Sequence, residues 1–176
     1  MNKVAVLGCG VVGKGIVEIL TDNGAGIAKN LGEEVELKYV LEKRDCSGES
    51  FAHKVIDDIN IILADEEVSI VCECIGGVGI AYEFIKKCLM AGKSVVTCNK
   101  HLVAEHGLEL LAIAREKGVS FLFEASVGGG IPALRPLSLC LTGNRVHEVL
   151  GIINGTTNYI LTDMRRNGTA FADSLA

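Results

Sequence analysis

Three glycines near the start of the chain have the spacing of a phosphate-binding turn. Gly8, Gly10 and Gly13 form a Gly-x-Gly-x-x-Gly pattern between the apolar run VAVL and the apolar-periodic residues 11–20. The first glycine permits a tight turn, the second lets the backbone approach a pyrophosphate, and the third allows close packing of helix on strand. Free amides at the helix start then face the phosphates. We predict a dinucleotide site here, against the alternative of a glycine-rich turn that binds nothing.

The residues after the second predicted strand bear on which dinucleotide is bound. An acidic residue at this point hydrogen-bonds a ribose 2′-hydroxyl, whereas an arginine accommodates a 2′-phosphate. The chain has both, because Glu42 is followed by Lys43 and Arg44. We take Lys43 and Arg44 as candidate cofactor contacts, the alternative being a solvated charge cluster. The choice between NAD and NADP stays open.

Further chemistry-bearing residues follow later strands. Lys100 lies just beyond residues 94–98, at the edge where ligands of open α/β sheets bind. Cys98 could act as a thiolate nucleophile on an aldehyde, although a packing cysteine is the preferred interpretation. Glu124 precedes a run of three glycines whose carbonyls could converge on a hard cation or form a hinge between domains. Thr156 is either a helix cap or a substrate contact.

The order of predicted elements positions these residues on a parallel sheet. Strands and helices alternate, which is typical of an α/β fold of the Rossmann type. Residues 21–33 are predicted to be a helix end plus a loop, and 42–50 an exposed loop. The other predictions for the first part are strands at 3–7, 35–41, 69–75, 94–98 and 119–124, and helices at 11–20, 59–64, 80–91 and 104–117. In the last helix the inward side chains are predicted to be Leu108, Leu111, Ile113 and Ala114.

Composition shifts at the glycine run, where we place a domain junction. Residues 1–126 are predicted to form a dinucleotide-binding domain and residues 127–176 the start of a second, α+β domain. The second part is predicted to contain a helix at 133–141, a strand at 146–153 and a helix at 156–166.

Composition limits the function classes. The 176 residues include 22 acidic and 17 basic side chains, for a net charge of −5, and show no basic cluster of the kind that binds nucleic acid. Apolar runs are strand-length, and a strand begins at once, so we expect no membrane span and no secretion signal. Seven scattered cysteines are expected to be reduced, as in the cytoplasm.

Taken together, the motifs resemble the homoserine dehydrogenase family over nearly the whole chain. The stretches that carry the resemblance are VAVLGCGVVGKG, CECIGG, GKSVVTCNKHLVAEHG, FEASVGGGIPALRPL and GIINGTTNYIL. The resemblance implies an oxidoreductase of threonine and methionine biosynthesis. Its reaction would be NAD(P)-dependent, reversible hydride transfer between L-aspartate 4-semialdehyde and L-homoserine. It also implies a homo-oligomer when the protein is full length.

The resemblance also implies roles for individual residues. A monovalent cation, typically sodium, would be held mainly by backbone oxygens at Glu124, Val127, Gly129 and Ile131. The family's acid/base lysine lies beyond Ala176, so no catalytic residue is assigned here and the 176 residues alone are expected to be nearly inactive. The cofactor contacts would be Gly8, Cys9, Gly10, Val11, Val12, Gly13, Ile75, Gly76 and Lys100.

Two other interpretations remain at this point. One is a non-catalytic NAD(P)-binding module or subunit. The other is semialdehyde oxidation through a thiolate at Cys98.

Overall fold

The computed structural model describes residues 2–152 and 154–175. The chain divides into two compact units, Met1–Ser126 and Val127–Ala176. Each unit is described separately below.

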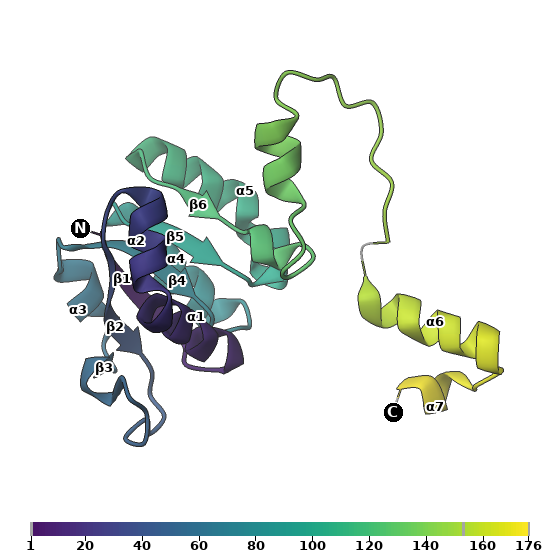
Figure 1. The fold of residues 1–176 in the computed structure, drawn as a ribbon, viewed down its shortest axis with the longest axis horizontal. Helices are drawn as coiled ribbons and strands as arrows, with labels where there is room; N and C mark the ends of the chain where they lie inside the picture. Colours follow the sequence, from purple (N-terminus) through teal and green to yellow (C-terminus); the bar gives the residue numbers. More distant parts are fainter. Residues whose placement is uncertain (1, 153, 176) are drawn as a thin grey trace. The chain divides into compact units, whose positions relative to one another are not determined.

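The first unit is built on a six-stranded parallel sheet with the order β3-β2-β1-β4-β5-β6 (Figure 1). In this order β1 lies at the centre, with β2 and β3 added on one side of it and β4, β5 and β6 on the other. The switch from one side to the other occurs between β1 and β4, and α/β proteins bind ligands in the crevice at such a switch point. The predicted Rossmann-type parallel sheet is therefore confirmed. The strands are β1 (Asn2–Leu7), β2 (Val35–Leu41), β3 (Val55–Ile56), β4 (Val68–Glu73), β5 (Ser94–Thr97) and β6 (Phe121–Leu122).

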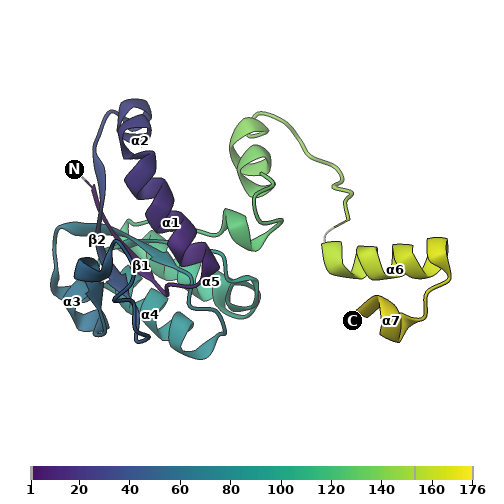
Figure 2. The ribbon, with the colours of Figure 1, turned by 60° about the horizontal axis from the view of Figure 1, so that its bottom comes forward.

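Helices cover both faces of this sheet because alternate residues of the central strand point to opposite sides (Figure 2). Ala5 and Leu7 pack in the core shared with α3, α4 and α5, whereas Val6 packs in the core shared with α1. The helices of this unit are α1 (Val11–Asp22), α2 (Gly24–Leu31), α3 (Ile59–Ala64), α4 (Gly79–Met90) and α5 (Lys100–Lys117).

Two predictions for the first unit are wrong in detail. The segment 21–33 is mostly helical, since α2 follows α1 almost directly and is capped after Leu31 by Gly32, which has φ +75°. Of the four side chains of α5 predicted to face inward, Ile113 and Ala114 pack in the core, whereas Leu108 and Leu111 are exposed. Leu102 and Leu110 are fully buried instead. The helix begins at Lys100, four residues before the predicted start. Its buried face includes Leu102, Leu110 and Ala114, which are separated by multiples of four residues and so lie on one side of the helix.

Strand lengths also differ from the prediction. The strand predicted at 69–75 is β4, which ends at Glu73, and the one predicted at 119–124 pairs with β5 only through the two residues of β6. The residues that follow β4 are thereby free to form the loop described in the next section.

The second unit is helical within its described residues. A π-helical turn covers Pro136–Cys140, and α6 (Gly155–Asn167) and α7 (Phe171–Leu175) follow. The predicted helix at 133–141 is thus shorter than expected. The predicted strand at 146–153 is wrong over 146–152, where no partner strand supplies a hydrogen-bond ladder, and residue 153 lies outside the described residues.

The cap of α6 also differs from the prediction. Asn154, not Thr156, precedes the helix, and its Oδ1 accepts a hydrogen bond of 2.8 Å from the Thr157 amide. Helix α6 itself matches the predicted 156–166 closely.

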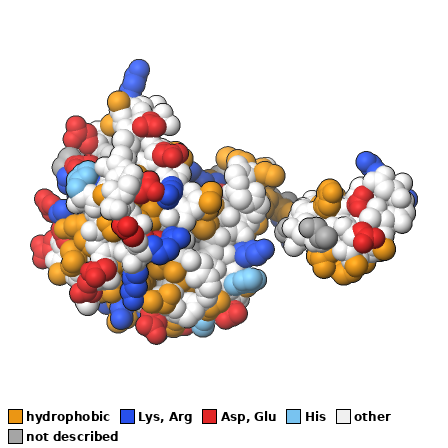
Figure 3. Space-filling view, turned by 90° about the horizontal axis from the view of Figure 1, so that it is seen from below, with side chains coloured by type: hydrophobic (Ala, Val, Ile, Leu, Met, Phe, Trp, Pro, Cys, Tyr) orange, Lys and Arg blue, Asp and Glu red, His pale blue; other side chains and the backbone are white. Residues whose placement is uncertain are grey.

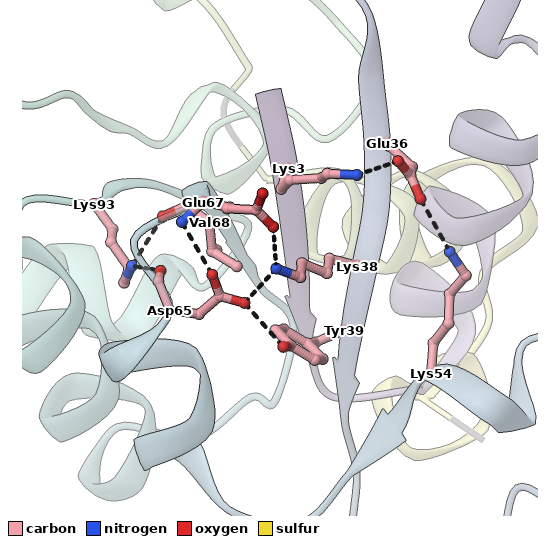
Figure 4. Close-up of polar contacts among 9 residues, drawn as sticks. All are labelled: Lys3, Glu36, Lys38, Tyr39, Lys54, Asp65, Glu67, Val68 and Lys93. Carbon is pink, nitrogen blue, oxygen red and sulfur yellow. Dashed lines mark hydrogen bonds and ion pairs between the residues drawn. The ribbon is translucent and has the colours of Figure 1, made fainter. Parts of the chain in front are cut away.

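A polar network ties together the amino-terminal edge of the sheet (Figure 4). Asp65 accepts from Lys38 Nζ at 2.6 Å and from the Tyr39 hydroxyl at 2.9 Å, and the Lys38 ammonium holds the pKa of Asp65 at about 2. The buried Lys93 donates to the carbonyls of Asp65 and Val68 at 2.6 and 2.9 Å, and burial lowers the pKa of Lys93. This edge lies opposite the glycine turn, so the network stabilises the sheet away from the candidate site.

The exterior carries charges of both signs. Figure 3 shows acidic and basic side chains interspersed over the face in view, rather than a broad patch of one sign. Among the described residues, none of the helices has the length and apolar character needed to cross a bilayer.

Candidate functional site

The turn between β1 and α1 depends on a glycine at position 8. Gly8 has φ +90°, a conformation that side chains rarely adopt, and a Cβ there would lie 2.9 Å from the carbonyl oxygen of Cys74. The turn is tied to both neighbouring strands, because the Gly8 amide donates to Leu41 and the Cys74 amide donates to Leu7. The backbone of the turn is therefore fixed at the carboxyl edge of the sheet.

The other two glycines of the motif have different environments. A Cβ at Gly13 would lie 2.0 Å from the Gly8 carbonyl oxygen, so this glycine lets α1 pack directly on the turn. A Cβ at Gly10 would meet nothing within 4 Å, and its φ of −79° suits any residue. The protein thus leaves Gly10 with free space on its outer side, as close approach of a ligand requires. Val11, at the start of α1, is 92% exposed on the same surface.

Glu42 lies beside this turn and is the first residue after β2. Its Oε2 accepts from the Cys9 amide at 2.9 Å and from the Arg44 guanidinium at 2.6 Å. Its Oε1 accepts from the amides of Lys43 and Arg44 at 2.9 and 3.1 Å. The hydrogen bonds from Arg44 and from these backbone amides lower the pKa of Glu42 to about 2. The side chain is therefore a fixed carboxylate at the mouth of the turn.

A cavity of about 430 Å³ opens along this edge of the sheet. It brings together several residues that the sequence singled out, from the glycine turn, the end of β2 and the loop after β4. Its lining residues are Gly8, Gly10, Leu41, Glu42, Lys43, Arg44, Asp57, Cys74, Ile75, Ile80 and Phe84.

Six of the predicted cofactor residues are not among those that line this cavity: Cys9, Val11, Val12, Gly13, Gly76 and Lys100. Cys9 is 3% exposed, so its thiol packs in the core while its amide binds Glu42. Val12 is exposed at the start of α1. Gly76 lies in the loop after β4, and Lys100 is exposed as the first residue of α5.

A buried carboxylate that the sequence analysis missed holds the loop after β4. Glu73 is fully buried, and its Oε1 accepts from the amides of Ile75 and Gly76 at 2.7 and 3.4 Å. Its Oε2 accepts from the Thr97 hydroxyl at 2.6 Å. The signal in the sequence is a lone glutamate inside the apolar run SIVCECI, since a buried carboxylate needs a full set of partners.

The same network reaches the residue before Lys100. The Thr97 hydroxyl accepts from the Asn99 amide at 3.0 Å, and Asn99 Oδ1 caps α5 by accepting from Leu102 at 3.2 Å. The Asn99 side chain also donates to the Gly77 carbonyl. The loop 75–77 and the start of α5 are therefore locked together, with Gly76 and Gly77 both at positive φ.

Cys98 lies next to this network. Burial, together with the neighbouring Cys98, raises the pKa of the Cys74 thiol. His101, the histidine nearest to Cys98 in sequence, is exposed. Cys98 is a free, partly buried cysteine, and its role as a packing residue stays a prediction.

The residues of the predicted cation site belong to different units. Glu124 is the first residue of a 3₁₀ turn that ends the first unit, whereas Val127, Gly129 and Ile131 open the second. Within the second unit, the Ile131 amide donates to the Gly128 carbonyl at 3.1 Å, with Gly128 and Gly129 at positive φ. The site stays a prediction.

Both units are similar to known proteins. Residues 8–124 match the model of the homoserine dehydrogenase NAD-binding domain, and residues 132–176 match the homoserine dehydrogenase model. A curated homoserine dehydrogenase from Pseudomonas aeruginosa is 41% identical over 175 residues, which cover 99% of this chain and 40% of that protein.

Solved structures give the same picture. A homoserine dehydrogenase from Thiobacillus denitrificans superposes with a TM-score of 0.91 at 40% identity, covering 99% of this chain and 41% of the other. A hyperthermophilic archaeal homoserine dehydrogenase mutant in complex with NADPH has a TM-score of 0.78 at 22% identity, covering 99% and 59% respectively, which is a likeness of fold.

Proposed function

The chain belongs to the homoserine dehydrogenase family, and from this membership we propose the activity of the protein that contains it. The proposed reaction is NAD(P)-dependent, reversible conversion of L-aspartate 4-semialdehyde into L-homoserine. The chain spans about two fifths of the length of the relatives it matches. The observation that carries the proposal is the fixed glycine turn with open space at Gly10 beside a cavity of about 430 Å³.

The first role proposed for these residues is to bind the diphosphate of the cofactor. The amides that begin α1 have no partners within the helix and carry a partial positive charge, so they favour an anion. Gly10 leaves the space for its approach, and Gly13 brings the helix start close to the turn. The residues proposed to contact the cofactor are Gly8, Cys9, Gly10, Val11, Val12, Gly13, Lys43, Arg44, Ile75, Gly76 and Lys100.

A second role is to hold the reactive end of the cofactor and the substrate. When bound, a nicotinamide ring supplies or accepts the hydride. Glu73, Thr97 and Asn99 fix the loop 75–77 and the start of α5. This arrangement presents Lys100 as a positive charge on the same loop-and-helix junction, where it would stabilise negative charge on the carbonyl oxygen of an aldehyde.

The remaining parts of the proposal concern groups outside the nucleotide site. Backbone oxygens at Val127, Gly129 and Ile131, with Glu124, are proposed to hold a monovalent cation such as sodium, since oxygen ligands suit hard cations. We also propose that the full-length protein is a homo-oligomer. The 176 residues alone are expected to bind nucleotide with little turnover.

Two measurements test the proposed function. Titration of the chain with NADH and NADPH, followed by nucleotide fluorescence, should give saturable binding. The full-length protein should oxidise NADH or NADPH in the presence of aspartate 4-semialdehyde. Saturable binding with no turnover by the full-length protein would instead identify a non-catalytic nucleotide-binding module, and absence of binding would refute both.

A further inference from the structure

We propose that the buried carboxylate of Glu73 strengthens binding of the oxidised nicotinamide cofactor relative to the reduced one. The inference rests on the proposed function and deepens it, because it assigns to one residue a bias between the two redox states of the cofactor. Its basis is the set of hydrogen bonds to Glu73, the burial of its side chain, and the direction of the two peptide groups that it holds.

The strand order places Glu73 under the nicotinamide half of a bound dinucleotide. With the diphosphate on the turn after β1, the adenosine ribose of such a cofactor lies over the end of β2. The other half then extends to the opposite side of β1, where β4 is the neighbouring strand. Glu73 is the last residue of β4, directly before the loop 75–77.

The hydrogen bonds of Glu73 are those of an ionised carboxylate. Its Oε1 accepts from the amides of Ile75 and Gly76, which can only donate. The Thr97 hydroxyl accepts from the Asn99 amide at 3.0 Å and donates its single hydrogen to Oε2 at 2.6 Å. All the partners that the structure describes for this carboxyl group are therefore donors, and a proton on Glu73 would have no acceptor among them.

Burial lets this charge act over a longer distance than a surface charge does. The Glu73 side chain is fully buried, so water screens it weakly. Within the described part of the chain its hydrogen-bond partners include no basic side chain, so no ion pair neutralises it. Lys100, the cation at the start of α5, is exposed and is therefore screened more strongly.

The peptide groups held by Glu73 extend the negative potential toward the cavity. The two amides that donate to Glu73 belong to the peptide groups whose carbonyls are those of Cys74 and Ile75. In a trans peptide the carbonyl points away from the N–H, so both carbonyls point away from Glu73. The Cys74 carbonyl oxygen faces the glycine turn, 2.9 Å from where a Cβ at Gly8 would lie. Cys74 and Ile75 both line the cavity.

The two redox states of the cofactor respond differently to a negative potential. The oxidised nicotinamide ring is a cation, whereas the reduced ring is neutral. A fixed negative charge beneath the ring therefore stabilises the oxidised cofactor and has little effect on the reduced one. A role limited to holding the loop would change the affinity for both forms alike.

The test is calorimetric titration of the unmodified chain, Glu73→Gln and Glu67→Gln with oxidised NAD, NADH and ADP-ribose. Glu67→Gln removes the same charge at the opposite edge of the sheet and is the matched control (Figure 4). In Glu73→Gln the ratio of the Kd of NAD to the Kd of NADH should rise about tenfold over its value in the other two proteins. ADP-ribose has the diphosphate but no nicotinamide, so a change in its Kd measures damage to the rest of the site.

A measurement on the unmodified chain keeps the test valid if Glu73→Gln misfolds. Nicotinic acid adenine dinucleotide, whose ring carries a carboxylate in place of the amide, should bind about tenfold more weakly than NAD. Equal or tighter binding of this acid, or an unchanged ratio of NAD to NADH affinity in a folded Glu73→Gln, would overturn the inference. Failure of ADP-ribose and both nucleotides to bind the unmodified chain at about 1 mM would instead overturn the proposed function.

Discussion

Replacing Gly13 by alanine tests the packing of α1 on the turn, because the same replacement at Gly15, two residues away, introduces no clash and serves as the control. A methyl group at position 13 would lie 2.0 Å from the Gly8 carbonyl oxygen, well inside any normal contact. Gly15, in the same helix, has nothing within 4 Å of its hypothetical Cβ. Gly13→Ala and Gly15→Ala therefore make the same chemical change in opposite surroundings.

The expected magnitudes follow from two opposing effects. Replacing a helical glycine by alanine stabilises a helix by about 0.5–1 kcal/mol, which Gly15→Ala should show in full. In Gly13→Ala the methyl must push α1 away from the turn, and overpacking of this kind costs about 3 kcal/mol. We expect a net loss of about 2 kcal/mol for Gly13→Ala, and a difference between the two variants of about 3 kcal/mol.

Urea unfolding followed by circular dichroism measures both variants against the unmodified chain. The midpoint should fall for Gly13→Ala and rise for Gly15→Ala, with the slope unchanged. If Gly13→Ala were as stable as Gly15→Ala, helix α1 would not be in contact with the turn, and the argument for its phosphate-binding geometry would fail.

Two further predictions concern the polar networks. Thr97→Val removes one hydrogen-bond partner of the buried Glu73 carboxylate and the acceptor of the Asn99 amide. The variant should have a free energy of unfolding lower by about 2 kcal/mol and should bind NADH more weakly. An unchanged urea midpoint would contradict this prediction. Asp65, with a pKa of about 2, stabilises the fold above its unfolded pKa near 4, so stability should decline as the pH falls from about 4.5 to 2. In Asp65→Asn this decline should shrink by about 1 kcal/mol, and identical acid titrations of stability would count against the Lys38–Asp65 pairing.

Local patterns predicted the frame of the first unit well. Apolar or alternating runs within three residues of a glycine predicted β1, β2 and β5, and the glycine spacing located the turn at residues 8–13. Each of these features depends on a few consecutive residues, which is why the sequence alone predicts it. The inward face of α5 was predicted correctly at Ile113 and Ala114 but not at Leu108 and Leu111, because an apolar residue type does not by itself determine which side of a helix faces the core. The start of this helix was missed because it depends on Asn99, whose capping role competes with a loop interpretation of the same residues.

The candidate site was harder to predict because its polar contacts join residues far apart in sequence. Glu42 binds the Cys9 amide across 33 positions, and Glu73 binds Thr97 across 24. Neither partner can be found from spacing alone. Over residues 146–152 the predicted strand is wrong for a related reason, since alternation indicates a strand only where a neighbouring strand is present to pair with it.

Gly10→Val tests most directly whether main-chain amides at the start of α1 bind the cofactor diphosphate. The valine side chain would enter space that the protein leaves empty, at a backbone conformation that valine tolerates, so the fold should lose only about 1 kcal/mol. NADH titration followed by fluorescence should then give a Kd weaker than about 1 mM for a variant that remains folded by circular dichroism. A folded Gly10→Val chain that binds NADH as tightly as the unmodified chain would show that the diphosphate lies elsewhere.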